Sequence, residues 1–173
     1  MRNPVVRRTV AVILVGCALA ACREPPALPR APVVAEVIDG DTLTVDFGDR
    51  IETVRLLGID TPESVDPTRP IQCFGTEATT QLAGLVPPGT PVTIERDADP
   101  RDRYGRLLAY VFRTDDGLFV NHEMLRGGFA DISIYEPNTA YRTLFTKSVV
   151  GARTAETGLW GSCGGPDVPL DPP

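Results

Sequence analysis

Alternating apolar and polar residues mark the first part of the folded chain as a series of short strands. Such alternation is typical of strands that bury one face, and it predicts strands over residues 33–38, 42–47 and 51–57, with Gly58 and Ile59 continuing the third. The segments between them, DGD at 39–41 and GD at 48–49, carry turn-forming residues. Three short strands joined by tight turns indicate an antiparallel meander.

The second part of the chain mixes helical and strand periodicity. Apolar residues recur on one helical face over residues 75–86, and Pro87-Pro88-Gly89 ends that helix. Two further strands and two further helices follow; they are expected over residues 90–96 and 106–112 for the strands, and over 121–126 and about 138–157 for the helices. Asn121 is expected to cap the shorter helix.

The order of these elements predicts an α+β fold that is mainly a β barrel. Three strands, a helix, two strands and two more helices match a five-stranded OB-fold barrel with three flanking helices. OB barrels bind oligonucleotides and oligosaccharides, but a fold alone does not settle function.

The N-terminus has the features of an export signal. Arg2, Arg7 and Arg8 precede a short apolar stretch over residues 9–21, too short to span a bilayer, which needs about 20 residues. Residues 1–21 are therefore expected to be a signal peptide. The sequence LAAC ending at Cys22 resembles a bacterial lipoprotein signal, and LVGC at Cys17 is a weaker match. We expect an exported protein, either an envelope lipoprotein anchored in the membrane through Cys22 or a secreted protein.

Proline-rich segments flank the predicted domain. Residues 22–32 contain four prolines without apolar periodicity and read as an extended tether. Residues 164–173 resemble a disordered tail, so the folded domain is expected over residues 33–163. Nothing in the sequence points to an oligomer, and we expect a monomer.

Two cysteines remain beyond Cys22. Export places Cys73 and Cys163 in an oxidising compartment, and they lack the spacing of a metal site. A disulfide between them is the economical interpretation, and two free buried thiols are the alternative.

The net charge argues against a simple polyanion-binding protein. The chain carries a formal charge of −6, and loss of residues 1–21 would leave 14 basic against 23 acidic residues, or −9. Binding to nucleic-acid phosphates depends on Lys and Arg. Any nucleic-acid function must therefore rest on local basic residues.

Acids at the ends of predicted strands form a candidate metal site. Asp41 follows a glycine in a turn and Asp60 ends another strand. If the strands are neighbours, the two carboxylates repel unless they share a proton or a cation. Ca²⁺ prefers such oxygen ligands, and the carbonyl of Thr61, whose direction is fixed by Pro62, is a plausible third ligand. A solvated turn residue remains the alternative for either acid alone.

Two arginines and a glutamate complete a candidate catalytic set. Arg55 lies in an apolar strand, where an unpaired guanidinium would be costly to bury. Arg55 and Arg106 could hold one phosphate between them, and Glu63 could act as a general base. The set suits phosphodiester hydrolysis, although a network of salt bridges at strand ends is an equally open interpretation.

Three motifs in order give a resemblance to a known family. VIDGDT at 37–42, RLLGIDTPE at 55–63 and DRYGR at 102–106 resemble the signature blocks of staphylococcal nuclease (thermonuclease) domains. The resemblance covers about residues 33–160. One departure is Ser133, where the family has a second tyrosine near Tyr135.

The resemblance implies roles for individual residues. Asp41, Asp60 and Thr61 would bind Ca²⁺, and Arg55, Glu63 and Arg106 would be catalytic. A further set would contact the nucleic-acid substrate: Arg103, Tyr104 and Tyr135. Members of the family cleave DNA and RNA and release 3′-phosphate products. The alternatives are a non-catalytic OB-fold lipoprotein that binds nucleic acid or glycan, and a structural envelope protein.

Overall fold

A computed structural model describes residues 30–65, 68 and 70–170 of the chain. The predicted signal peptide, Cys22 and all but the end of the tether lie outside the described residues. Within the described part, no helix is both long and apolar enough to cross a membrane.

The predicted meander forms the first half of the barrel. Its strands are β1 (Val33–Val37), β2 (Thr42–Asp46) and β3 (Ile51–Leu56), and each pairs antiparallel with the next. The second turn contains Gly48, which has a φ of 92° that residues other than glycine rarely adopt. The tight turns fix the register, so Thr42 lies opposite Arg55.

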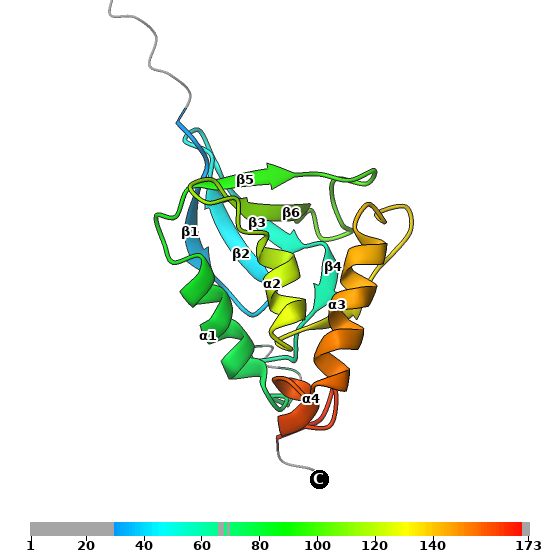
Figure 1. Cartoon of the computed structure of the whole chain (residues 1–173). Helices are drawn as coiled ribbons and strands as arrows, with labels where there is room; N and C mark the ends of the chain where they lie inside the picture. The colour runs from blue at the N-terminus through cyan, green and yellow to red at the C-terminus, as the bar shows by residue number, and fades with distance from the viewer. Residues whose placement is uncertain (1–29, 66–67, 69, 171–173) are drawn as a thin grey trace, which may run out of the picture.

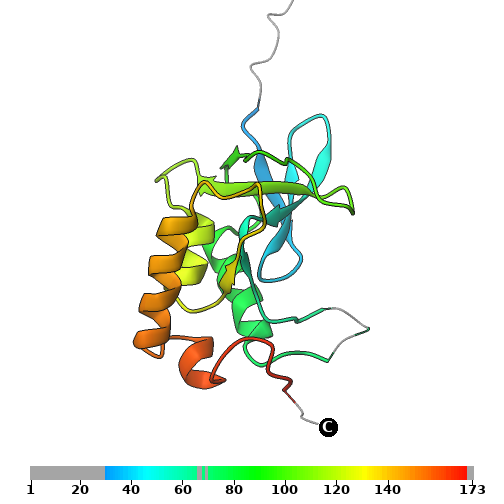
Figure 2. The ribbon, with the colours of Figure 1, turned by 90° about the vertical axis from the view of Figure 1, so that its right-hand side faces the viewer.

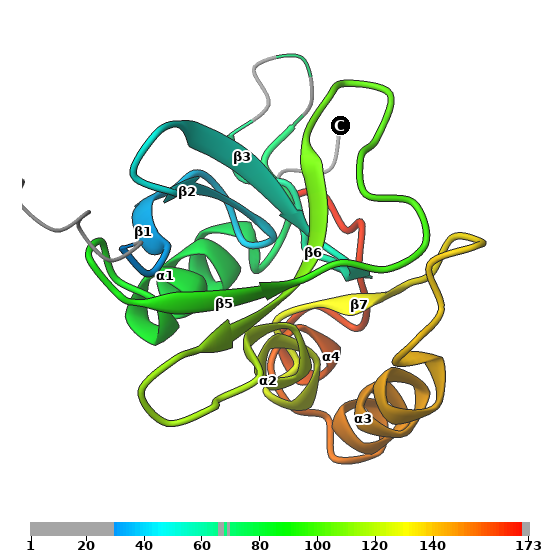
Figure 3. The same cartoon turned by 90° about the horizontal axis from the view of Figure 1, so that it is seen from above.

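Two later strands complete the sheet and bring its edges together. Strand β6 (Leu107–Arg113) runs parallel to β3 and antiparallel to β5 (Val92–Glu95), which gives the order β1-β2-β3-β6-β5. The segment before β5 returns to β1, where the Val34 N–H donates to the Thr90 carbonyl at 2.9 Å. Figure 3 shows the strands following one another around this curved sheet. The predicted α+β fold with a five-stranded OB-type sheet is confirmed.

The third predicted strand breaks where the sequence suggested that it continues. Gly58 has a φ of 79°, and a Cβ atom there would lie 2.5 Å from the Phe145 ring. The chain therefore leaves the main sheet and forms β4 (Gly58–Asp60), which pairs antiparallel with β7 (Asp131–Ser133). This separate pair carries Asp60 away from the end of β3 and sets its direction.

In the described part of the chain, four helices pack beneath the sheet (Figure 1). They are α1 (Gly75–Leu85), α2 (Val120–Arg126), α3 (Arg142–Thr154) and the short α4 (Leu159–Ser162). The long helix begins four residues later than expected, because the Asn138 side chain instead pairs with the backbone of Asp99 at 2.8 and 3.0 Å. The core beneath the sheet includes the fully buried Leu43, Leu56 and Phe145, and each such side chain contributes about 1.5–3 kcal/mol.

Asn121 lies inside α2, so the prediction that it caps this helix was wrong. Phe119 occupies the cap position, and the Asn121 side chain is completely buried. Its oxygen accepts from the Val111 N–H, and its amide nitrogen donates to the Leu57 carbonyl, both at 2.9 Å. Asn121 thus joins the helix to β6 and to the point where β3 and β4 diverge.

The C-terminal segment differs from the disordered tail that the sequence suggested. The disulfide Cys73–Cys163 joins it to the chain two residues before the start of α1, with the two Cα atoms 6.0 Å apart. Beyond it, the Cys73 N–H donates to the Val168 carbonyl at 2.7 Å, and the Leu170 N–H donates to the Ile71 carbonyl at 3.1 Å. Figure 2 shows this segment crossing beside the loop that precedes α1. Backbone pairing and a covalent link hold it there through Leu170.

Candidate active site

The turn between β1 and β2 places Asp41 against the end of β4. Gly40 makes this approach possible, because a Cβ atom at that position would lie 2.7 Å from the Thr61 hydroxyl and 2.9 Å from the Ala78 Cβ. Asp41 is consequently only 6 % exposed. Its Oδ2 accepts hydrogen bonds from the backbone N–H of Thr61 at 2.9 Å and from the Thr61 hydroxyl at 3.2 Å.

Arg55 brings the two predicted metal-binding acids together. Its Nη1 lies 2.7 Å from Asp41 Oδ2, and its Nη2 lies 2.6 Å from Asp60 Oδ1. The Arg55 side chain is 17 % exposed, whereas that of Asp60 is 55 % exposed. The costly burial of an arginine in an apolar strand is therefore offset by two carboxylates, one buried and one facing solvent.

A second acidic residue, Asp39, lies beside Asp41. Burial, together with the neighbouring Asp41 carboxylate, raises the pKa of Asp39 to about 6. Asp39 also accepts a hydrogen bond from the Asp41 N–H at 3.0 Å. The surroundings of Asp41 thus favour additional positive charge.

The loop before β6 supplies the opposite wall of the site. Arg106 Nε donates to Asp102 Oδ2 at 2.7 Å. Burial alone would raise the pKa of Asp102, but the hydrogen bonds from Arg106 outweigh it and hold the pKa below its usual value. The guanidinium carbons of Arg103 and Arg106 lie 4.7 and 5.6 Å from the centre of the Tyr104 ring. Asp102 orients Arg106, and the ring holds both cations on one side of the loop.

Two adjoining pockets meet between these walls. One of about 490 Å³ extends from the end of β3 toward the β7 side. The other, of about 430 Å³, contains Asp39, Asp41, Thr61 and Glu63. Five residues line both pockets: Arg55, Asp60, Arg103, Arg106 and Tyr135. The structure therefore brings the predicted acids and both predicted arginines around one continuous space.

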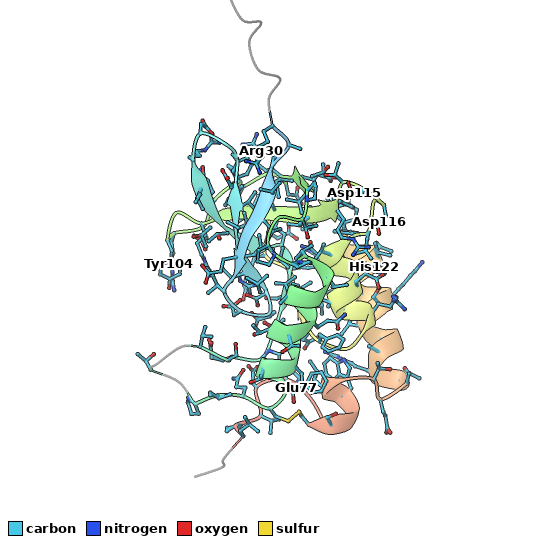
Figure 4. The ribbon with its side chains drawn as sticks, turned by 90° about the vertical axis from the view of Figure 1, so that its left-hand side faces the viewer. Arg30, Glu77, Tyr104, Asp115, Asp116 and His122 are labelled. Carbon is cyan, nitrogen blue, oxygen red and sulfur yellow. A yellow bond between two sulfur atoms is a disulfide. The ribbon has the colours of Figure 1, made fainter. Side chains whose placement is uncertain are left out.

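Exposed aromatic rings stand at the edge of this space. Tyr104 is 68 % exposed and Tyr135 is 78 % exposed, and Figure 4 shows Tyr104 projecting outward from the loop before β6. Ser133, at the position of the family's second tyrosine, lines the larger pocket. A planar ligand group bound there could stack on these rings.

Glu63 lies in the smaller pocket with its carboxylate turned toward its own loop. Oε1 accepts from the backbone N–H groups of Ser64 and Val65, both at 2.9 Å. Gln72 and Asp167 line the same pocket, and sequence reasoning missed both. The signal that could have found them is the predicted disulfide, because it brings the segment after Cys163 next to the segment before Cys73.

The donor set around Asp41 is suited to a hard cation. The predicted ligands, two carboxylates and the Thr61 carbonyl, are all oxygen atoms, as Ca²⁺ prefers. Asp41 and Asp60 both contact Arg55, so the two carboxylates lie close enough together to face one cation. Among the described residues there is no group of three or more His, Cys, Asp and Glu side chains that could hold a metal ion. The predicted set fits Ca²⁺ by the chemistry of its donors, and additional ligands would have to be backbone or solvent oxygens.

The fold and the pocket together define the class of protein. It is an OB-type α+β protein in which two arginines lie beside a group of acidic residues and suit an anionic ligand. The chain belongs to the family of staphylococcal nuclease homologues, whose sequence model matches residues 53–162. That match includes Arg55, Asp60, Glu63 and Arg106 and begins after Asp41.

Several named proteins are similar to most of this chain. A thermonuclease from Staphylococcus intermedius is 37 % identical over 128 residues, which cover 74 % of either chain. A thermonuclease from Staphylococcus hyicus is 33 % identical over 129 residues, covering 75 % of either chain. The prophage-derived endonuclease YokF from Bacillus subtilis is 40 % identical over 129 residues, covering 73 % of this chain and 43 % of YokF.

Proposed function

We propose that this protein is a calcium-dependent nuclease that hydrolyses phosphodiester bonds of DNA and RNA and leaves 3′-phosphate products. The observation that carries the proposal is the convergence of Arg55 and Arg106 on the pockets that also contain Asp41, Asp60 and Glu63. The similar proteins include thermonucleases and endonucleases, which supports the same reaction class.

The two arginines bind the scissile phosphate. A guanidinium donates parallel hydrogen bonds to two oxygens of a phosphate, and such charge-assisted bonds are strong. Arg55 approaches from β3 and Arg106 from the loop immediately before β6, and β3 and β6 are neighbouring parallel strands. Negative charge grows on the phosphate oxygens as a water attacks phosphorus, and these fixed cations stabilise it.

Glu63 accepts the proton of the attacking water. Its Oε1 receives two backbone N–H groups, which fix the direction of the carboxylate. A base of this kind must come within hydrogen-bond reach of the water.

Asp41, Asp60 and the Thr61 carbonyl would hold the calcium ion. When bound there, the ion supplies positive charge that offsets the charge developing on the phosphate. Arg55 contacts both acids in the structure, so it keeps the two carboxylates close together and ready to accept a cation.

Arg103, Tyr104 and Tyr135 would bind the nucleotides next to the cleaved bond. Bases stack on exposed aromatic rings with little dependence on sequence, which suits a nuclease acting on both DNA and RNA. Arg103 and Arg106 lie against the Tyr104 ring and provide local positive charge. Although the net charge of the chain is acidic, these residues provide the local basic groups on which binding to nucleic acid depends.

Export and lipid attachment at Cys22 would place this nuclease at the cell envelope. Arg30, the first described residue, lies at one end of the molecule, and Glu77 of α1 lies near the other (Figure 4). An anchor upstream of Arg30 would leave the end of the molecule that carries the C-terminal segment away from the membrane. Detection of a diacylglycerol group on Cys22 by mass spectrometry tests the attachment; a membrane fraction without it would contradict it.

Incubation with single-stranded DNA tests the proposed reaction. We expect shortening of the strand in millimolar Ca²⁺, no shortening with a chelator, and 3′-phosphate ends on the products. Binding without cleavage under the calcium condition would contradict catalysis and favour a non-catalytic OB-fold binding protein. Neither binding nor cleavage would favour a structural envelope protein.

A further inference from the structure

The C-terminal clasp, defined here as residues 163–170, forms one wall of the proposed active site. The disulfide from Cys163 to Cys73 fixes its beginning. Its far end is held by an antiparallel bridge between Pro169 and Gln72. Asp167 of the clasp lines the pocket that contains Glu63 and Asp41. A segment more than 90 residues away in sequence from Glu63 thus takes part in the same site.

Gln72 connects the clasp to Glu63 through three hydrogen bonds. Its side-chain Oε1 accepts from the Glu63 N–H at 2.6 Å, and its backbone N–H donates to the Glu63 carbonyl at 2.8 Å. Its side-chain Nε2 donates to Asp167 Oδ1 at 3.1 Å. Both the N–H and the carbonyl of Glu63 are therefore bonded to Gln72, and the clasp sets the orientation of the Gln72 side chain through Asp167.

The start of α1 restricts Glu63 from another side. A Cβ atom on Gly75 would lie 2.5 Å from the Glu63 carbonyl oxygen, so the helix begins in direct contact with the Glu63 backbone. The Cys73 N–H, between Gln72 and this helix start, donates to the Val168 carbonyl of the clasp at 2.7 Å. The Glu63 backbone is thus enclosed by Gln72 and Gly75, and the segment that carries them is attached to the clasp.

We propose that Gln72 is a positioning residue for Glu63 and that the clasp holds Gln72 in place through Asp167. The inference rests on the proposed nuclease function, because it assigns Glu63 the proton transfer that the positioning serves. A displacement of about 1 Å in a catalytic group can reduce the rate by about a hundredfold. Loss of the hydrogen bonds from Gln72 should therefore reduce kcat with little effect on substrate binding.

Substitution of Gln72 gives a direct test with a matched control in the same chain. We expect Gln72→Leu to lower kcat on single-stranded DNA about tenfold or more, with KM within about twofold of the wild type. Gln81, the only other glutamine, lies on α1 outside both pockets, and Gln81→Leu should leave both constants unchanged. Asp167→Ala should reproduce part of the loss, whereas Asp167→Asn, which keeps an oxygen acceptor for Nε2, should restore it.

Amide hydrogen exchange at Glu63 provides a second readout that does not require activity. The Glu63 N–H donates to the Gln72 side chain, so its exchange should become faster in Gln72→Leu and stay unchanged in Gln81→Leu. Equal kcat values for the two leucine variants, a change in KM alone, or unchanged exchange at Glu63 would each overturn the proposal. If the wild-type protein cleaves no DNA, the nuclease function fails, and the exchange rates alone decide whether Gln72 holds Glu63.

Discussion

Removal of the disulfide should lower the stability of the folded domain by several kcal/mol. Cys73 and Cys163 are 90 residues apart, so the bond closes a large loop in the unfolded chain. The chain-entropy relation gives about 4.6 kcal/mol for a loop of this length at 25 °C. Measured values commonly fall below that relation, so the expected loss for Cys73→Ala with Cys163→Ala is about 2–5 kcal/mol.

The size of this loss matters because small domains have little stability to spare. A typical free energy of unfolding is about 5–15 kcal/mol, so the change should be large in any unfolding curve. Urea unfolding followed by far-ultraviolet circular dichroism measures it directly. The protein from residue 30 onward suits this assay, because Cys73 and Cys163 are the only cysteines in it.

The wild-type protein in reducing buffer provides the control. Its urea midpoint should move to that of the double variant, and the double variant itself should not respond to reductant. A difference between wild type and variant below about 1 kcal/mol would refute the chain-entropy reasoning. It would show that the clasp and the core hold the two segments together without the covalent bond.

Three further predictions concern the metal, the buried amide and a surface ion pair. Ca²⁺ at a hundredfold excess over its Kd should raise the free energy of unfolding by about 2.7 kcal/mol, which a thermal shift assay detects as a higher Tm. The increase in Tm should vanish in Asp41→Asn and persist in Asp115→Asn, whose side chain is exposed. An increase that survives Asp41→Asn would contradict the assigned ligands. Asn121→Leu should lower the free energy of unfolding in urea by about 2–5 kcal/mol, because the Val111 N–H and the Leu57 carbonyl lose their hydrogen bonds to the Asn121 side chain. A loss under about 1 kcal/mol would refute this structural role of Asn121. Hydrogen bonds from Arg101 and Arg50 lower the pKa of Glu52 to about 2. The ionised Glu52 should therefore add about 1 kcal/mol to the free energy of unfolding at this surface site. This stabilisation should be present above the unfolded-state pKa and disappear as the pH falls toward 2. The difference in urea midpoint between wild type and Glu52→Gln should accordingly shrink from pH 7 to pH 3, and a difference independent of pH would contradict the assignment.

The sequence predicted the elements whose signals are local. The meander, the two later strands and α1 follow from alternation, helical periodicity and turn residues within a few positions of each element. The expected neighbourhood of Asp41 and Asp60 also follows, because both lie at the ends of strands that a barrel brings together. Arg55 in an apolar strand indicated that an anionic group, a carboxylate or a phosphate, would face it, and the structure places two carboxylates there.

The features that the sequence did not predict depend on contacts between distant segments. The β4–β7 pair contains only three residues in each strand, which is too few for an alternating pattern to be recognised in the sequence. The direction of this pair is set by the contact between Gly58 and Phe145. Asn121 resembled a helix cap by its neighbours in sequence, whereas tertiary packing gave its side chain backbone partners in β6 and after β3. The clasp contains prolines and glycines that suggest disorder, and only its pairing with residues 71–73 gives it a fixed position.

The most direct test of the central claim is the cleavage rate when one member of the proposed centre is changed at a time. The claim is that Glu63 and Arg106 act on one phosphate held between the two walls of the site. We expect Glu63→Gln and Arg106→Ala each to lower the calcium-dependent rate on single-stranded DNA by about a hundredfold or more. The exposed Glu77 and Arg96 provide matched controls, and Glu77→Gln and Arg96→Ala should cleave at the wild-type rate. Cleavage at the wild-type rate by both Glu63→Gln and Arg106→Ala would contradict the account.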